Sequence, residues 1–109
     1  MRMKIKCSVT YQGAARRPAL RIGDADRRLY FSRDNRNIIV EIDGTKFYTK
    51  LTDDFFWQVG QIRTLYEKPN AVTANVLVKW METNKLKVGD EVYLEVIEKN
   101  KCFKLVKSI

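Results

Sequence analysis

The feature that most constrains this chain is the number of strand-like segments within 109 residues. In residues 3–11 apolar and polar side chains alternate, which is the pattern of a half-buried β-strand. Residues 38–42 and 45–51 are rich in β-branched and aromatic side chains, and Asp43-Gly44 between them is a strong signal for a hairpin turn. We expect seven strands, at 3–11, 19–22, 28–32, 38–42, 45–51, 91–97 and 101–106. So many short strands in a small chain predict a barrel or a strongly curled sheet.

The hydrophobic period becomes helical after the fifth strand. Asp53 and Asp54 suit the first turn of a helix over 53–67, because carboxylates are stabilised at the positive end of the helix dipole. Pro69-Asn70 separates this segment from a second helix over 71–83. We therefore predict one domain, residues 1–109, with an α+β, mostly β fold. Its architecture is a small open pseudobarrel of about seven strands with two short helices, in the order βββββααββ.

Basic residues are distributed unevenly along the chain. The formal net charge is +8, and residues 1–37 hold ten basic and three acidic side chains, whereas residues 38–109 hold eleven and ten. Eight of the nine arginines fall in the first segment. Arginine presents a planar fork of donors that matches phosphate oxygens and the edge of guanine. A basic patch on a globular domain is the electrostatic footprint of a nucleic-acid-binding protein. We interpret the lysines of the second segment as ordinary solvated charge.

Other function classes find little support. The chain has no histidine and no phosphate-cradling glycine-rich loop, so we expect no catalytic site, no cofactor and no small-molecule substrate. Cys7 and Cys102 fall in expected strands and are interpreted as buried hydrophobic residues; a disulfide or a metal pair is the less favoured alternative. Asp53 and Asp54 fit a helix N-terminus better than a metal site. Without a stretch of ~20 apolar residues or a visible secretory signal, we expect no membrane partner and a cytoplasmic or nuclear location.

A stretch near the C-terminus resembles a known family of DNA-binding domains. The residues that carry the resemblance are Trp80, Asn84, Leu86, Gly89 and Asp90, followed by Val92, Tyr93 and Leu94. In B3-type DNA-binding domains a Trp near a short helix precedes the same N-x-L-x-x-G-D pattern and a strand of valines and aromatics. The resemblance covers residues 80–106, and AbrB-like swapped-hairpin transcription factors carry a similar run. It implies a seven-stranded pseudobarrel with two short helices, shared with effector domains of some restriction endonucleases, and a DNA ligand. The first 45 residues show no family signature.

The resemblance to B3-type domains also implies where DNA is held. In that family two arms grip the major groove, and the loops at 12–17 and 33–37 are the corresponding segments here. Base contacts are expected from residues whose side chains pair with guanine or adenine, namely Arg16, Arg17, Arg33, Asn35, Arg36 and Asn37. Phosphate contacts are expected from Arg27, Arg28, Lys4 and Lys6, and Arg21 completes the set. DNA is favoured over RNA mainly through the resemblance.

Two alternatives remain open at this point. A basic interaction or inhibitor protein that binds an acidic protein partner or a ribonucleoprotein would use the same arginines. Trp57 falls off the apolar face of the expected helix and is a candidate for contact with a protein partner. An RNA-binding protein needs exposed aromatics for base stacking, but packing is the favoured interpretation of Tyr11, Tyr30 and Tyr48.

Overall fold

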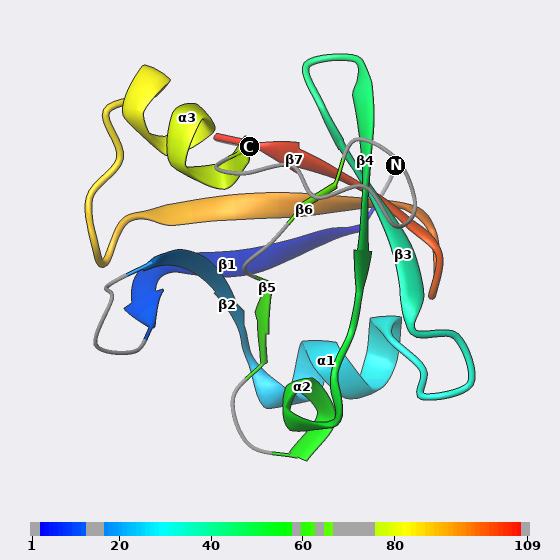
Figure 1. Cartoon of the computed structure of the whole chain (residues 1–109). Coiled ribbons are helices and arrows are strands. Elements are labelled where there is room, and N and C mark those ends of the chain that lie inside the picture. Colours follow the sequence, from blue (N-terminus) through cyan, green and yellow to red (C-terminus); the bar gives the residue numbers. More distant parts are fainter. Residues whose placement is uncertain (1–2, 13–16, 58–59, 63–64, 67–75, 108–109) are drawn as a thin grey trace.

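One curled sheet of seven strands dominates the structure (Figure 1). The computed structural model describes residues 3–12, 17–57, 60–62, 65–66 and 76–107. The strands are β1 (Lys4–Gln12), β2 (Arg17–Ile22), β3 (Asn37–Ile42), β4 (Thr45–Lys50), β5 (Gln61–Ile62), β6 (Glu91–Glu98) and β7 (Cys102–Val106). The helices are α1 (Asp24–Tyr30), α2 (Asp53–Trp57) and α3 (Val76–Thr83). The predicted class, a mostly β open pseudobarrel of about seven strands, is confirmed.

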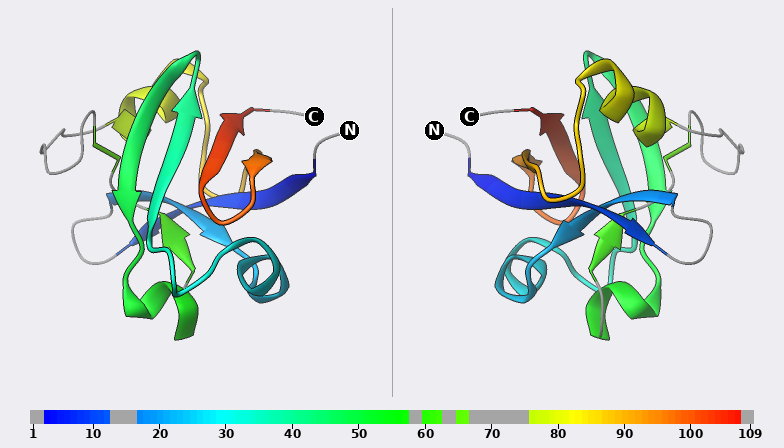
Figure 2. Two further views of the ribbon diagram at one scale, coloured as in Figure 1. Left: turned by 90° about the vertical axis from the view of Figure 1, so that its right-hand side faces the viewer. Right: turned by 90° about the vertical axis from the view of Figure 1, so that its left-hand side faces the viewer.

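The sheet has the order β4-β3-β7-β6-β1-β2-β5, with one parallel pair, β3 and β7, among antiparallel neighbours. The two edges approach each other through one short stretch of chain. In this stretch Ile62 pairs with Leu20 of β2, and Tyr66 exchanges two backbone hydrogen bonds of 2.7 Å with Tyr48 of β4. The edge of β4 is thereby partly covered, which limits its pairing with other chains. Helices α1 and α2 lie at one end of this half-barrel and α3 lies at the other (Figure 2).

The core forms because the strands alternate as their sequences predict. In β1 the side chains of Ile5, Cys7 and Val9 are buried, and β3 buries every second residue in the same way. Helix α3 adds three buried side chains, Leu77, Trp80 and Met81. At the other end of the barrel the ring of Phe31 stacks on that of Phe103, with centroids 4.7 Å apart, and meets the ring of Phe55 edge to face at 5.0 Å. Trp80 belongs to the core, and Leu86 packs against it.

Both cysteines are free thiols, and only Cys7 is fully buried. Burial raises the pKa of the Cys7 thiol to about 12, because the thiolate loses its hydration inside the core. Cys102 is half-buried in β7. The interpretation as a buried hydrophobic residue is therefore confirmed for Cys7. It is wrong for Cys102, which is only half-buried.

The expected strand at 28–32 is wrong, because α1 occupies most of it. Acidic residues lie in the first turn of α1 and basic residues in its last turn, which complements the helix dipole. The side chains of Asp24 and Arg28 pair at 3.0 Å with helical spacing. Tyr30 and Phe31, whose β propensity suggested a strand, instead enter the core at the end of the helix. A run of apolar residues this short fits either element.

The expected helix at 53–67 is also wrong in extent, because α2 ends at Trp57 and the chain is extended again at β5. Gly60 explains the interruption. Its carbonyl accepts a hydrogen bond of 2.7 Å from the amide of Ile22, and a Cβ there would lie 2.1 Å from Cδ of Arg27. Glycine is thus required for this close approach to α1 and β2. The second expected helix matches α3 from Val76 onward; residues 71–75 lie outside the described residues.

Candidate nucleic-acid interface

The unbalanced positive charge of the first third belongs to its first 22 residues. Residues 1–22 carry six basic side chains and no acidic one, whereas residues 23–54 carry six basic and seven acidic ones. Residues 55–109 carry nine and six. The β1–β2 hairpin is therefore the part of the chain whose cations have no acidic residue beside them in sequence.

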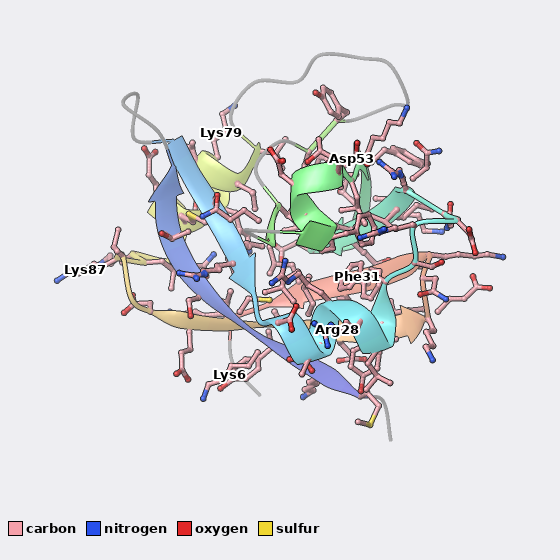
Figure 3. All side chains as sticks on the ribbon, turned by 90° about the horizontal axis from the view of Figure 1, so that it is seen from below. Lys6, Arg28, Phe31, Asp53, Lys79 and Lys87 are labelled. Atoms are coloured by element: carbon pink, nitrogen blue, oxygen red, sulfur yellow. The ribbon has the colours of Figure 1, made fainter. Side chains whose placement is uncertain are left out.

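The arginines at the α1–α2 end are neutralised by aspartates. We use this name for residues 23–36 and 53–57, which together hold four basic and five acidic side chains. Arg28 pairs with Asp24 at 3.0 Å, and Arg36 pairs with Asp53 from α2. The guanidinium carbons of Arg33 and Arg36 both lie over the ring of Phe56, 5.7 and 5.6 Å from its centre. Figure 3 shows Arg28 on α1 and Asp53 on α2 at this end.

Arg27 is a buried residue, so its expected contact with phosphate is wrong. Only 8% of its surface is exposed. One guanidinium nitrogen donates to the carbonyl oxygen of Phe55 at 2.6 Å, and another lies 3.5 Å from Oδ1 of Asp24. The stem passes over Gly60. Arg27 therefore joins α1 to α2 and to the segment before β5, and a surface ligand cannot reach it.

Asn35 also has a structural contact. Its side-chain nitrogen donates to the carbonyl oxygen of Asn100 at 2.6 Å, and the amide of Asn100 donates to the carbonyl of Tyr30 at 3.0 Å. These bonds hold the turn at 32–35 against the turn between β6 and β7. Asn37 is exposed at the start of β3, opposite Lys50 of β4.

Lys4 and Lys6 lie on the outer face of the sheet, where acidic residues face them. The register places side chains of alternating charge directly opposite one another across five strands, in the row Lys46, Glu41, Lys104, Glu95 and Lys4. Lys6 pairs with Glu91 of β6 at 3.3 Å. Opposite charges in such positions stabilise a sheet modestly. The outer face is therefore close to neutral, and these two lysines contribute little to a basic patch.

The strand ends that flank the first expected arm lie at the opposite side of the molecule from the second expected arm. In Figure 1 the end of β1 and the start of β2 lie at the left, and the turn at 32–36 lies at the right. Figure 3 shows the same separation from below. A single grip by both segments, as the resemblance implies, does not fit this arrangement. Arg16 lies outside the described residues, and Arg17 is the first residue of β2.

The loop at 84–90 brings two further cations to the hairpin. The amide of Gly89 donates to the carbonyl of Val9 at 2.9 Å, and the amide of Val9 donates to the carbonyl of Asp90 at 2.8 Å. Lys85 and Lys87 in this loop are exposed. We call this loop and the hairpin from Ser8 to Arg21 together the hairpin end; the end of β1 and the start of β2 lie at the left of Figure 1. Sequence reasoning missed both lysines because it grouped charges by position in the chain.

The outer part of the hairpin is a two-stranded ribbon. Strand β6 pairs with β1 only up to Ser8, and β5 pairs with β2 only at Leu20 and Arg21. Beyond these positions β1 and β2 pair with each other as far as Gln12 opposite Arg17. Arg21, opposite Ser8, is exposed. The strand edges of this ribbon are not paired with other strands of the described sheet. The loop before β6 bonds to Val9 at its base, and Ala19 within it is fully buried.

No helix in the described part of the chain is long and apolar enough to cross a membrane. Within the same residues no group of three or more metal-ligating side chains comes together. The side chain of Trp57, expected at a partner surface, lies outside the described residues; its backbone ends α2. Of the tyrosines expected to pack, Tyr30 is buried, Tyr48 is half-buried and the side chain of Tyr11 is outside the description.

Comparison with known proteins identifies a family whose function is unknown. The family model described as "Family of unknown function (DUF7112)" matches residues 3–108. No curated protein and no solved structure matches the chain. The resemblance of residues 80–106 to B3-type domains therefore stays a prediction.

Proposed function

The chain belongs to the DUF7112 family of unknown function, and we propose that it binds nucleic acid, with double-stranded DNA held against the hairpin end. The observation that carries this proposal is the far part of the β1–β2 hairpin, residues 8–21, which holds three arginines and no acidic residue. Phosphate groups are the ligands that such unbalanced charge attracts most strongly, through release of their counterions. The cations at the α1–α2 end and on the outer sheet face already have acidic neighbours.

Duplex DNA suits the shape of the hairpin end. The major groove of B-form DNA admits a two-stranded β-ribbon, whereas the major groove of A-form RNA is too narrow for side chains to read. The part of β1 and β2 from Thr10 opposite Ala19 to Gln12 opposite Arg17 is such a ribbon. In this proposal Arg16 and Arg17 approach the groove, and Arg21 with Lys85 and Lys87 holds phosphates on either side.

A fluorescence titration tests the proposal. Labelled random duplex DNA, single-stranded DNA and duplex RNA are titrated with the protein between about 50 and 200 mM salt. We expect the tightest binding to duplex DNA and a steep loss of affinity with salt. Changing Arg16, Arg17 and Arg21 to Gln removes three cations, so the slope of log K against log salt should fall by about 2.7.

The matched control removes three exposed cations from elsewhere, at Lys50, Lys99 and Lys101. This variant has the same net charge as the hairpin variant and should keep most of the affinity. Equal losses in both variants would show that only net charge matters. Absence of salt-sensitive binding to any nucleic acid would overturn the proposal and favour an acidic protein partner for the same arginines. Circular dichroism confirms that both variants fold.

A further inference from the structure

One exposed apolar residue lies between the two lysines of the hairpin end and the strand that follows. Val88 is 54% exposed and follows Lys87 in the loop. Single exposed apolar residues are common on protein surfaces. Val88 differs from them because it lies on a loop that is fixed in one conformation and carries cations next to it.

Hydrogen bonds fix the loop at both of its ends. At the start, the side chain of Asn84 donates to the carbonyl of Trp80 at 2.8 Å, and the amide of Leu86 donates to the carbonyl of Met81 at 2.9 Å. At the end, the amide of Lys87 donates to a carboxylate oxygen of Asp90 at 2.7 Å. The loop therefore keeps its shape without a ligand, which lowers the entropy lost on binding.

The tip is also tied to the hairpin. The amide of Asp90 donates back to the carbonyl of Lys87 at 3.0 Å, which closes a turn around Val88 and Gly89. Gly89 has a φ of 95°, a conformation that favours glycine. Its amide and the carbonyl of Asp90 both bond to Val9 of β1. Val88 is thus held beside the ribbon that is proposed to enter the groove.

A protein partner does not fit this residue well. Protein interfaces have an apolar centre of several side chains. The other large apolar side chains that are strongly exposed in the described residues are Met3, Leu29 and Ile97. Met3 precedes β1, Ile97 lies near the end of β6 and Leu29 lies on α1, so all three are away from the loop tip. Val88 is an isolated exposed apolar group that follows two exposed lysines in the loop and precedes Asp90 and Glu91.

An isolated apolar group next to exposed lysines fits the major groove of DNA. Thymine presents its methyl group there, and apolar side chains contact it, while flanking cations hold the phosphates. We propose that the loop at 84–90 is a second DNA contact, in which Lys85 and Lys87 hold phosphates and Val88 packs against thymine methyl groups. This proposal rests on the proposed function and adds a preference for thymine at the contacted position.

The test compares two duplexes of the same A·T-rich sequence, one with thymine and one with uracil in its place, which lacks the methyl group. We expect the wild-type chain to bind the thymine duplex more tightly, by about fourfold for each methyl group contacted. Val88→Ser should remove this difference and leave the salt slope unchanged. Changing Lys85 and Lys87 to Gln should lower the slope by about 1.8 and keep the thymine preference.

Leu29→Ser is the matched control, because Leu29 is 52% exposed and lies on α1. It should change neither the preference nor the slope. Thermal unfolding checks that each variant is folded, and Val88→Ala provides a second, apolar truncation. Equal binding of both duplexes by the wild-type chain overturns the role of Val88 and leaves the proposed function standing. A preference that survives in Val88→Ser and Val88→Ala also overturns it. Absence of binding to either duplex overturns both proposals.

Discussion

The hairpin end and the α1–α2 end are both rich in arginine, yet they differ in what surrounds the charge. At the α1–α2 end Arg28 and Arg36 pair with aspartates, Arg27 is buried, and five acidic residues face four basic ones. In the far part of the β1–β2 hairpin, residues 8–21 hold three arginines and no acidic residue. Only Lys4 and Lys6, earlier in β1, face glutamates of β6. Two segments that look alike as sequence therefore have opposite electrostatic character once the chain is folded.

This difference shows that net charge must be summed over the folded surface and not along the sequence. Asp53 comes from a helix that follows two intervening strands, and it reaches Arg36 only because α2 folds back against the turn at 32–36. Lys85 and Lys87 join the hairpin from a still more distant segment, through the bonds of Gly89 and Asp90 to β1. Folding therefore places aspartates beside the arginines of the α1–α2 end. It places two lysines beside the hairpin, together with Asp90 and the glutamates that face Lys4 and Lys6.

The largest expected effect concerns the buried arginine of the α1–α2 end. Gly60→Ala would place a Cβ 2.1 Å from Cδ of Arg27 and 2.9 Å from the carbonyl oxygen of Ile22. Both cannot be relieved by one side-chain movement, so we expect a loss of about 3 kcal/mol in the free energy of unfolding. Urea unfolding measures it. Gly23→Ala is the control, because a Cβ there meets nothing within 4 Å.

A double-mutant cycle sharpens this prediction. Arg27→Ala alone removes the donor to the Phe55 carbonyl and should cost about 1–3 kcal/mol. Combined with Gly60→Ala it should cost less than the sum, because the closest clash is with the Arg27 side chain. Additive losses, or a Gly60→Ala variant as stable as the wild type, would show that Arg27 does not occupy this position.

The next effect concerns the thiol of Cys7, which is buried on the inner face of the hairpin. The pKa of Cys7 is raised to about 12 by burial, so the folded protein holds this proton more tightly than the unfolded chain, whose thiol has the ordinary value of 9.0. Its contribution to stability is complete below pH 9 and is lost as the pH rises toward 12. The loss is about 1.4 kcal/mol per pH unit in that window.

Unfolding in urea at several alkaline pH values measures the Cys7 effect. Cys7→Ala is subtracted at each pH, because tyrosines and lysines also titrate there. A difference between the two chains that does not change with pH would mean that Cys7 reaches solvent. Cys102, half-buried on β7, should react with a maleimide before Cys7 does.

Much of the sheet could be predicted from sequence because its signals are local. The alternation of β1 leads directly to the burial of Ile5, Cys7 and Val9. Asp43 and Gly44 both have positive φ, 51° and 84°, as a two-residue hairpin turn of this type requires. The two runs of alternating apolar residues at 91–97 and 101–106, with a short polar turn between them, likewise predict the paired strands β6 and β7.

The features that the sequence did not predict depend on contacts between segments that are distant in the chain. The run at 28–32 fits a strand or a helix, and the docking of Tyr30 and Phe31 into the core decides for α1. Helical spacing continues past Trp57, but Gly60 must approach Arg27 closely and the chain leaves the helix. The burial of Arg27 and the arrival of Lys87 beside β1 have no local signal, so the candidate site could be predicted only as a cluster of arginines.

A smaller effect distinguishes a structural asparagine from an exposed one. Asn35→Ala removes the bond to the Asn100 carbonyl, which is partly buried, so we expect a loss of about 1 kcal/mol in stability. DNA affinity should stay unchanged, because this turn lies opposite the hairpin end. Asn37→Ala is the control and should change neither quantity. Lower DNA affinity with normal stability in either variant would restore the role of base contact that the sequence suggested.

The smallest expected effect is also the most direct test of the difference between the hairpin end and the α1–α2 end. Changing Arg28, Arg33 and Arg36 to Gln removes as much charge as the hairpin variant at Arg16, Arg17 and Arg21. At the α1–α2 end the lost cations leave Asp24 and Asp53 behind, and Asp53 is 73% exposed. Because this end does not face the DNA in our proposal, the affinity should change by less than about twofold beyond the general effect of net charge, and the salt slope should stay the same. Equal loss of slope in the two variants would mean that DNA is held at both ends of the molecule. In that case phosphates replace the aspartates as partners of the arginines at the α1–α2 end when DNA binds.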